Sequence, residues 1–228
     1  MDDILQAVGK PGRSTLPCVS IVVLAAGRSS RMKDQGHKLL AHFSGVPLLR
    51  KSVLSAIASD SQAVVVVMGE RRAELTETIA DLDVSVVENT DFASGLASSI
   101  RVGVMTAQER KPDGVLIALA DMPTIEASQL DRLIVAFREH MGTCVIRATG
   151  NDRPGNPVIF PSTWFERLSG LSGDGGARAL LKDNAAVIVD VEIGEAALID
   201  VDTPEELIAA GGVPFTRDAQ GTVSSPES

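Results

Sequence analysis

Short runs of apolar residues alternate with amphipathic stretches along most of the chain. The runs are rich in Val and Ile and carry no polar alternation, so they predict strands buried on both faces of a sheet. The strands predicted in this way are 21–24, 63–68, 84–87, 114–120, 143–147, a short one that ends at 160, and 187–191. Strands that alternate with helices in this order predict a mostly parallel sheet.

The stretches between these strands have the spacing or composition of helices. Apolar residues recur at helical intervals from Pro47 to Ile57, and Pro47 suits the start of a helix. Residues 71–82 have helical composition, and Thr203 with Pro204 has the cap and first turn of a last helix. A further helical stripe, which we expect to lie in the core, consists of Leu130, Leu133, Ile134, Phe137 and Met141.

The 228 residues are most simply one domain with extensions at both ends. We expect a loosely ordered N-terminal extension over residues 1–17 and a three-layer α/β/α domain over residues 18–210. Residues 211–228 are rich in Gly, Ser, Pro and Thr and predict a disordered tail.

Composition and charge exclude several classes of function. The net charge of −9 argues against broad binding to nucleic acid or to acidic membranes. No run has the length of a transmembrane helix, and the N-terminus lacks the order of a signal peptide. Cys18 and Cys144 fit reduced thiols better than a disulfide framework or a metal cluster. We therefore expect a cytoplasmic protein.

One segment departs from the acidic background. Residues 28–51 carry six basic residues and one acidic residue. A positive pocket on an acidic protein suits a small polyanion, although a solvated basic face gives the same pattern.

The first predicted strand leads directly into this basic segment. Ala25 and Ala26 narrow the chain, and Gly27 allows backbone N–H groups to approach a phosphate closely. Arg28 and Arg31 can then reach one anion. The alternative is a strand-to-loop transition with solvated arginines. Neither Gly-x-Gly-x-x-Gly nor Gly-Lys-Ser/Thr is present, which weighs against a Rossmann dinucleotide site and against a P-loop.

Carboxylates are expected at the same edge of the sheet. The strand over 114–120 runs into Asp121, and a hard oxygen ligand for Mg²⁺ is a better interpretation of this residue than a helix cap. Asp200 and Asp202 alternate along an extended segment and so share one face. Either could supply a second carboxylate for the metal.

A polar loop over 89–95 passes into a helix and carries small hydroxyl groups. Gly95, Ser98 and Ser99 place hydroxyls and free amides at a helix N-terminus, where they can bind a base or a phosphate. A simple helix cap is the alternative.

The loop after the first strand also resembles a known family. The segments Leu24–Met32, Lys38–Leu40 and Gly45–Leu49 resemble the opening of the MobA-like nucleotidyltransferases, and most closely the molybdenum cofactor cytidylyltransferases. The resemblance implies a Rossmann-like nucleotidyltransferase sheet and a loop that wraps the triphosphate of a nucleotide. The nucleotide-binding residues that it implies are Leu24, Ala25, Ala26, Gly27, Arg28, Ser29, Arg31, Lys38, Gly95, Ser98 and Ser99.

The loop departs from the family pattern at the lysine. The family generally has Arg-Met-Gly-x-x-Lys, whereas Lys33 stands here in place of the glycine and Lys38 lies two residues later. The run Lys38-Leu-Leu favours Lys38 as the matching lysine, with Lys33 as its rival.

Later segments resemble other family elements. Asp121-Met-Pro resembles the metal-binding element of the family, and the segment from Ile199 to Leu207 resembles its closing Asp-x-Asp-Thr-Pro-Glu-Asp-Leu. Asn156 stands where the family has a histidine that faces the acceptor. The segment that holds Asp174 and Arg178 resembles an element that faces the acceptor pterin, although a glycine-rich surface turn is an equal alternative.

By this resemblance the chain transfers CMP from CTP to the terminal phosphate of the molybdenum-bound pterin cofactor, with Mg²⁺, and releases pyrophosphate. Ala25-Ala26 before Gly27 favours CTP, because the guanylyl branch usually has Ala-Gly-Gly. Arg31, Lys38 and Asp121 are the residues that such catalysis would depend on. A molybdoenzyme or its chaperone is the protein partner that the resemblance implies.

Two other functions are compatible with the sequence. One is a transferase of the same fold that acts on a sugar phosphate or on methylerythritol phosphate. The other is a non-catalytic protein that carries a nucleotide or cofactor to an enzyme. No Ser-His-Asp or Cys-His set stands out, and the three histidines are expected to be surface or structural residues: His37, His42 and His140.

Overall fold

A seven-stranded sheet forms the middle layer of the computed structural model, which describes residues 16–32, 36–173, 176–182 and 187–215. In spatial order its strands are β5 (Ser85–Glu88), β4 (Ala63–Met68), β1 (Val19–Ala25), β6 (Gly114–Leu119), β8 (Arg153–Pro161), β7 (Val145–Gly150) and β9 (Ile188–Glu192). Within this sheet β8 alone is antiparallel to its neighbours. The prediction of a mostly parallel sheet is therefore confirmed.

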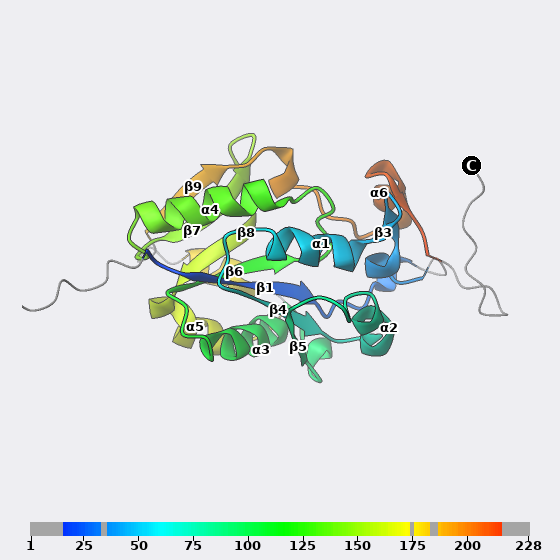
Figure 1. The fold of residues 1–228 in the computed structure, drawn as a ribbon, viewed down its shortest axis with the longest axis horizontal. Coiled ribbons are helices and arrows are strands. Elements are labelled where there is room, and N and C mark those ends of the chain that lie inside the picture. Colours follow the sequence, from blue (N-terminus) through cyan, green and yellow to red (C-terminus); the bar gives the residue numbers. More distant parts are fainter. Residues whose placement is uncertain (1–15, 33–35, 174–175, 183–186, 216–228) are drawn as a thin grey trace, which may run out of the picture.

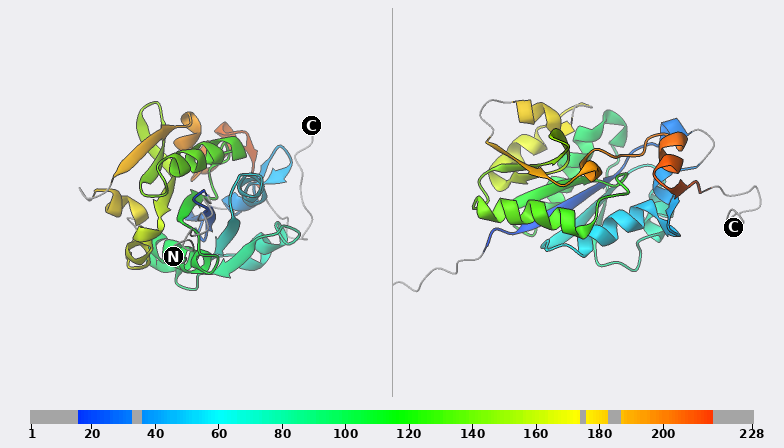
Figure 2. Two further views of the ribbon diagram at one scale, coloured as in Figure 1. Left: turned by 60° about the vertical axis from the view of Figure 1, so that its left-hand side comes forward. Right: turned by 90° about the horizontal axis from the view of Figure 1, so that it is seen from above.

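Helices cover both faces of the sheet, which makes three layers (Figure 1). On one face lie α1 (Leu48–Ile57) and α4 (Ala127–Glu139), and on the other lie α3 (Leu96–Gln108) and α5 (Phe165–Ser169). Two shorter helices, α2 (Arg72–Glu77) and α6 (Pro204–Ala209), lie toward the carboxyl ends of the parallel strands. Figure 2 shows the same layers from the end and from above. The 3₁₀ helices of the described residues are η1 (Ser30–Met32), η2 (Lys38–Leu40), η3 (Phe92–Ser94), η4 (Ser162–Trp164), η5 (Gly176–Lys182) and η6 (Glu195–Ala197).

Strand β1 lies at the centre of two apolar layers. Its residues are buried along the whole strand, as a central parallel strand requires. Ile21 and Val23 pack with the α1 and α4 side, and Val22 packs with the α3 side. A Cβ at Gly103 of α3 would lie 2.3 Å from Cγ1 of Val22, so the absence of a side chain lets this helix lie directly on the sheet.

The described chain stays folded beyond the predicted domain end. Gly212 and Val213 form β10, which pairs with β2 (His42–Phe43), and β2 pairs in turn with β3 (Val46–Pro47). The prediction that a disordered tail begins at residue 211 is therefore wrong for these residues. Residues 1–15 and 216–228, most of the expected extension and tail, lie outside the described residues.

Two helical predictions also need correction. Arg71 adopts a left-handed conformation with φ of 55°, and α2 spans only Arg72–Glu77 rather than 71–82. Met141 follows the end of α4 with φ of 53° and is 73% exposed, so it is not part of the core stripe. By contrast, Thr203 and Pro204 begin α6 with a complete capping box.

None of the helices in the described ranges combines the length and the apolar character needed to span a bilayer.

Candidate active site

A cavity of about 250 Å³ opens where β1 and β6 end. The carboxyl edge of the parallel strands is the place where open α/β sheets bind their ligands. The side chains and loops that line the cavity come from the ends of these strands, from η2 and from the start of α3. They are Leu24, Ala25, Ala26, Gly27, Lys38, Leu39, Phe92, Gly95, Leu96, Ser99, Leu119 and Asp121.

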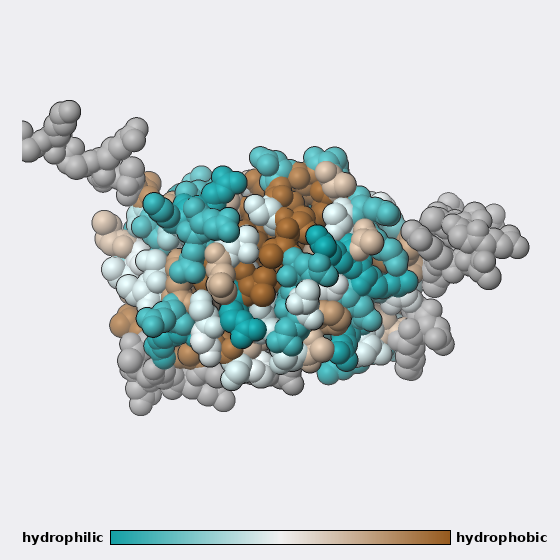
Figure 3. Space-filling view, turned by 90° about the horizontal axis from the view of Figure 1, so that it is seen from below, coloured by the Kyte–Doolittle hydropathy of each residue, from teal (hydrophilic) through white to brown (hydrophobic). Residues whose placement is uncertain are grey.

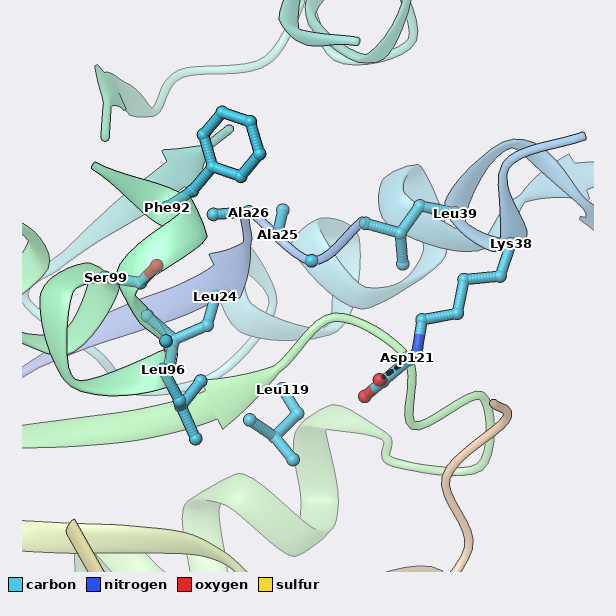
Figure 4. Close-up of a pocket in the computed structure, with 12 residues that line it drawn as sticks. Leu24, Ala25, Ala26, Lys38, Leu39, Phe92, Leu96, Ser99, Leu119 and Asp121 are labelled. Carbon is cyan, nitrogen blue, oxygen red and sulfur yellow. Dashed lines mark hydrogen bonds and ion pairs between the residues drawn. The ribbon is translucent and has the colours of Figure 1, made fainter. Parts of the chain in front are cut away.

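Lys38 and Asp121 line one end of the cavity, and Asp202 is paired with Lys38 there. The Lys38 ammonium donates to Oδ2 of Asp121 at 2.6 Å and to Oδ1 of Asp202 at 2.7 Å. Figure 4 shows Lys38 and Asp121 pointing toward each other at one side of the cavity. The Lys38 side chain is only 10% exposed, so this ammonium is paired in a partly dehydrated environment. We call this end, with Arg31, the charged end.

Neighbouring charges shift the pKa values of Lys38 and Asp202. Burial alone would lower the pKa of Lys38, but the charges and hydrogen bonds of Asp121 and Asp202 raise it above its ordinary value. Burial alone would raise the pKa of Asp202, but Lys38 and then Arg31 lower it. The pair of Lys38 and Asp202 is therefore charged at neutral pH.

Asp200 lies beside this cluster without joining the ion pairs. Its pKa is raised, first because protein atoms desolvate its carboxyl and then because Asp121 and Asp202 repel its negative charge. The amide of Val201 donates to the carbonyl of Asp121 at 3.0 Å, which anchors the segment of Asp200 and Asp202 on the strand end that carries Asp121.

A divalent cation bound at this end of the cavity would be held by the carboxylates of Asp121 and Asp202. In the described ranges, no three His, Cys, Asp or Glu side chains converge as a ready-made metal site. The Lys38 ammonium lies between Asp121 and Asp202 instead. Oδ1 of Asp121, however, is buried and has no hydrogen-bond partner within the described residues. A carboxylate oxygen left in this state fits a cation, provided that Lys38 gives up at least one of its partners.

His37 holds the helical turn that carries Lys38. The Leu39 amide donates to Nδ1 of His37 at 3.3 Å, so Nδ1 is unprotonated and Nε2 carries the hydrogen. Nε2 then donates to the Gly27 carbonyl at 3.1 Å, which ties η2 to the loop after β1. Burial lowers the pKa of His37 from 6.5 to about 4, and the charges of Arg71 and Lys38 act in the same direction. His37 is therefore a neutral structural residue, as predicted, but one with a direct part in the site.

The loop residues 27–31 lie differently from one another. Arg31 is 70% exposed and donates to Oδ2 of Asp202 at 2.6 Å. The Arg28 guanidinium lies over the Phe92 ring at 5.6 Å, away from the carboxylates that hold Lys38. Ser29 adopts a φ of 51°, and its buried hydroxyl has no partner among the described residues.

Gly27 is not required by the folded chain itself. A Cβ there would meet nothing within 4 Å, and the residue is not in a left-handed conformation. Because Gly27 nevertheless lines the cavity, its missing side chain leaves free space next to the backbone where a ligand can approach.

The lining of the other end is apolar and uncharged, although the Arg28 guanidinium lies over Phe92 outside that lining, and we call it the neutral end. Phe92 and Leu96 lie there together with Ser99 (Figure 4). Viewed from the α3 side, apolar side chains form an open strip bordered by hydrophilic residues (Figure 3). Gly95 is the N-cap of α3, in agreement with the cap interpretation of this loop, and no side chain caps the helix. Ser98 is buried and bonds to Asn89 and to the loop backbone rather than lining the cavity.

The predicted acceptor residues are only partly described. Asn156 lies on β8, two residues before Val158 in the sequence. Because β8 is antiparallel to β6 and Val158 pairs with Ile117, Asn156 lies toward the carboxyl end of β6. Asp174 and the rival lysine, Lys33, lie outside the described residues. Arg178 is in η5, but its side chain is not described.

Sequence reasoning missed several residues of the site. Phe92, Leu96 and Leu119 line the cavity, but apolar residues at element ends carry no signal that separates a lining from a core. Asn89 and His37 act through hydrogen bonds to buried partners, which no sequence spacing reveals.

Comparison with known proteins agrees with this geometry. The MobA-like NTP transferase domain matches residues 21–188. PucB, a purine catabolism protein of Bacillus subtilis, is 33% identical over 81% of this chain and 92% of its own length. Nicotine blue oxidoreductase of Paenarthrobacter nicotinovorans is 29% identical over 86% of this chain and 98% of its own. The molybdenum cofactor cytidylyltransferase of Escherichia coli is 25% identical over 86% of this chain and 96% of its own.

Solved structures share the fold. Rv0371c from Mycobacterium tuberculosis superimposes with a TM-score of 0.74 at 24% identity, over 86% of this chain and 98% of that one. It has also been solved as a complex with manganese. An open α/β sheet with a cavity at the carboxyl ends of its parallel strands places the chain in the class of ligand-binding α/β domains. Within that class, the chain belongs to the MobA-like nucleotidyltransferase family.

Proposed function

We propose that the protein transfers CMP from CTP to the terminal phosphate of the molybdenum-bound pterin cofactor and releases pyrophosphate. The observation that carries this proposal is the cavity with two unlike ends, one apolar with a single hydroxyl and one with paired charges. The neutral end suits a base and the charged end suits a triphosphate. The similarity to the Escherichia coli cytidylyltransferase supports this donor and this acceptor.

The reaction needs alignment and charge neutralisation rather than a protein nucleophile. An oxygen of the acceptor phosphate attacks the α-phosphorus of CTP, a new P–O bond forms, and the bond to the β-phosphate breaks. Pyrophosphate leaves with the negative charge that develops on it. We infer that Lys38 and Arg31 would neutralise that charge, and their position at the charged end supports this role.

Lys38 has to change partners for this role. Its ammonium is committed to two carboxylates, so it releases at least one of them when it bonds a phosphate. Asp121, with Asp202 or Asp200, would then be free to hold a divalent cation such as Mg²⁺. When bound, such a cation neutralises phosphate charge as a Lewis acid.

The acceptor would lie on the β8 side of the cavity. Asn156 lies toward the carboxyl end of β6, where β6 also presents Asp121. Gly173 accepts a hydrogen bond from the Ala97 amide at 3.3 Å, which brings the segment before Asp174 and Arg178 to the start of α3. Both observations support a role for these residues in binding the acceptor.

The test is incubation with the molybdenum cofactor and each of the four nucleoside triphosphates, followed by mass analysis of the products. We expect the cytosine dinucleotide form of the cofactor and pyrophosphate with CTP. Formation of another dinucleotide would show that a nucleoside triphosphate other than CTP is the donor. If products formed with a sugar phosphate or with methylerythritol phosphate and none formed with the molybdenum cofactor, that phosphate would be the acceptor instead.

A carrier protein without turnover is the second candidate. One observation favours it, because Lys38 is already neutralised by two carboxylates and is not free for a phosphate. Tight binding of CTP or cofactor without release of pyrophosphate would establish the carrier function instead.

A further inference from the structure

Asn89 connects the start of α3 to the cavity through two serines. Its Nδ2 donates to Oγ of Ser98 at 2.8 Å and to Oγ of Ser99 at 2.9 Å. All three side chains are buried, and only Ser99 reaches the cavity. The hydrogen bonds of this network are therefore shielded from competition with water.

The direction of each hydrogen bond follows from one backbone donor. The Asp91 amide donates to Oδ1 of Asn89 at 3.0 Å, and a backbone N–H can only donate. The oxygen of the Asn89 side chain is thus identified, and its NH₂ group must face the serines. Both serine oxygens consequently act as acceptors toward Asn89.

The two hydroxyl protons then go to different places. Ser98 donates its proton to the carbonyl of Asp91 at 3.0 Å or of Gly95 at 2.8 Å. Ser99 has no such acceptor among the described residues, and its hydroxyl lines the cavity (Figure 4). The hydrogen of Ser99 is therefore available to a bound ligand.

We propose that Asn89 is a positioning residue that makes Ser99 a hydrogen-bond donor to the base of the bound nucleotide. This inference rests on the proposed function, and it deepens it by stating how the base is selected. Ser99 lies at the neutral end, away from Lys38 and Asp121. Both bases carry an acceptor at O2, so the selection would come from N3 facing Ser99, where cytosine presents an acceptor and uracil carries an N–H. A serine held as a donor therefore favours CTP over UTP.

The sharpest variant is Asn89→Asp, which keeps the shape but removes the NH₂ donor. The serines would then donate to the new carboxylate, and Ser99 would offer the cavity only lone pairs. We expect CTP affinity to fall roughly 5- to 100-fold, the effect of an unmatched buried polar group. UTP affinity should fall less, so the preference for CTP narrows. In turnover, KM should rise more than kcat changes.

A double-mutant cycle separates positioning from the added charge and from a structural role. With Ser99→Ala present, Asn89→Asp should cost much less CTP affinity than it does alone, because Asn89 acts through Ser99. Thr106→Val is the matched control, since it removes an α3 hydroxyl that, among the described residues, hydrogen-bonds to the Val102 carbonyl alone. Melting curves of every variant check the fold.

Several results would overturn the inference while leaving the proposed function intact. They are unchanged CTP affinity in Ser99→Ala, strictly additive effects in the cycle, or equal losses for CTP and UTP. The Ser99→Ala result decides even where Asn89→Asp does not fold. Failure of the wild-type protein to bind any nucleoside triphosphate would instead contradict the proposed function.

Discussion

The two ends of the cavity are built from different interactions. At the charged end, Lys38 is held by two carboxylates that come from distant parts of the chain. At the neutral end, Asn89 and the serines form a hydrogen-bonded network in which donors and acceptors are already matched. One end depends on charge and the other on the direction of dipoles.

The difference separates a part that must rearrange from a part that is preorganised. Ion pairs are non-directional, so Lys38 can exchange a carboxylate for a phosphate with little change in geometry. The Asn89 network has one consistent set of hydrogen-bond directions and gains nothing from rearrangement. We therefore expect variants of the charged end to change turnover, and variants of the neutral end to change which nucleotide binds.

Asp121→Asn should have the largest effect. It removes the charge at the end of β6 but keeps the shape, so turnover should fall by roughly 1000-fold or more, as expected for loss of a cation-binding carboxylate. The ratio of CTP to UTP affinity should stay unchanged, because Asp121 belongs to the charged end. Pyrophosphate release measures the first quantity, and equilibrium titration measures the second.

The control for this variant is Asp83→Asn, an exposed aspartate before β5 at the opposite edge of the sheet. It should retain normal turnover. Near-normal turnover of a folded Asp121→Asn protein would remove Asp121 from the proposed cation site.

Lys38→Met should come next, with a loss of CTP turnover of roughly 100-fold. The same change should strengthen Mn²⁺ binding in the absence of nucleotide, because Asp121 and Asp202 lose their shared ammonium. Lys33→Met should lose much less turnover under identical salt. Lys51→Met on α1 is the control for loss of a positive charge.

The ranking of the two lysines is open to contradiction. A larger loss in Lys33→Met would mean that Lys33 holds the phosphate and Lys38 only balances the carboxylates. Small, equal losses would favour the carrier function.

Most of the fold could be predicted because buried parallel strands are visible as apolar runs. The runs that became β1, β4 and β6 needed no information beyond their own composition. The prediction that Met141 belongs to the core stripe is wrong because the helical spacing of apolar residues continues past Glu139. The helix α4 ends there, and Met141 lies in a left-handed turn. Arg71 was misplaced for the same kind of reason, since helical composition says little about the backbone at the end of a strand.

The site was predictable only in part. Asp121 follows an apolar strand, so its place at the sheet edge is a local inference. The pairing of Lys38 with Asp202 joins residues 164 positions apart, and the sequence predicted both residues in one site but not their ion pair. Asn89 in a polar loop is typical of any turn, and nothing in the sequence around His37 shows that it is 3% exposed.

Gly27→Ala tests the boundary between the two ends and should have a smaller effect. Because a Cβ there contacts no atom of the described residues, the free energy of unfolding should be unchanged or raised by about 0.4–1 kcal/mol. KM for CTP should rise roughly tenfold, because the methyl group occupies space next to the ligand. The KM values of all nucleoside triphosphates should rise by a similar factor.

Gly170→Ala at the end of α5 is the matched control, because that glycine also has an ordinary conformation and a Cβ there would make only ordinary contacts, at 3.6 and 3.7 Å, with backbone oxygens. An unchanged KM in Gly27→Ala would mean that the ligand does not approach this part of the backbone.

Lowering the pH should destabilise the site through protonation of His37. Near neutral pH this effect should be smaller than those of the substitutions above. The folded pKa of about 4 lies below the unfolded value of 6.5, so the unfolded chain binds more protons between these values. The stability that neutral His37 provides is therefore complete above pH 6.5 and is lost as the pH falls toward 4. Between pH 7 and pH 5 this loss amounts to about 2 kcal/mol in the free energy of unfolding.

Protonation of Nδ1 would also break the bond from the Leu39 amide and loosen the turn that carries Lys38. CTP turnover should then fall with the loss of stability, while the preference for CTP over UTP stays constant, because Asn89 and Ser99 do not titrate. His37→Gln should flatten the pH dependence of stability measured by denaturant unfolding. A pH dependence identical to that of the wild type would assign the acid sensitivity to other groups. A nucleotide preference that changes with pH would show that the two ends are coupled.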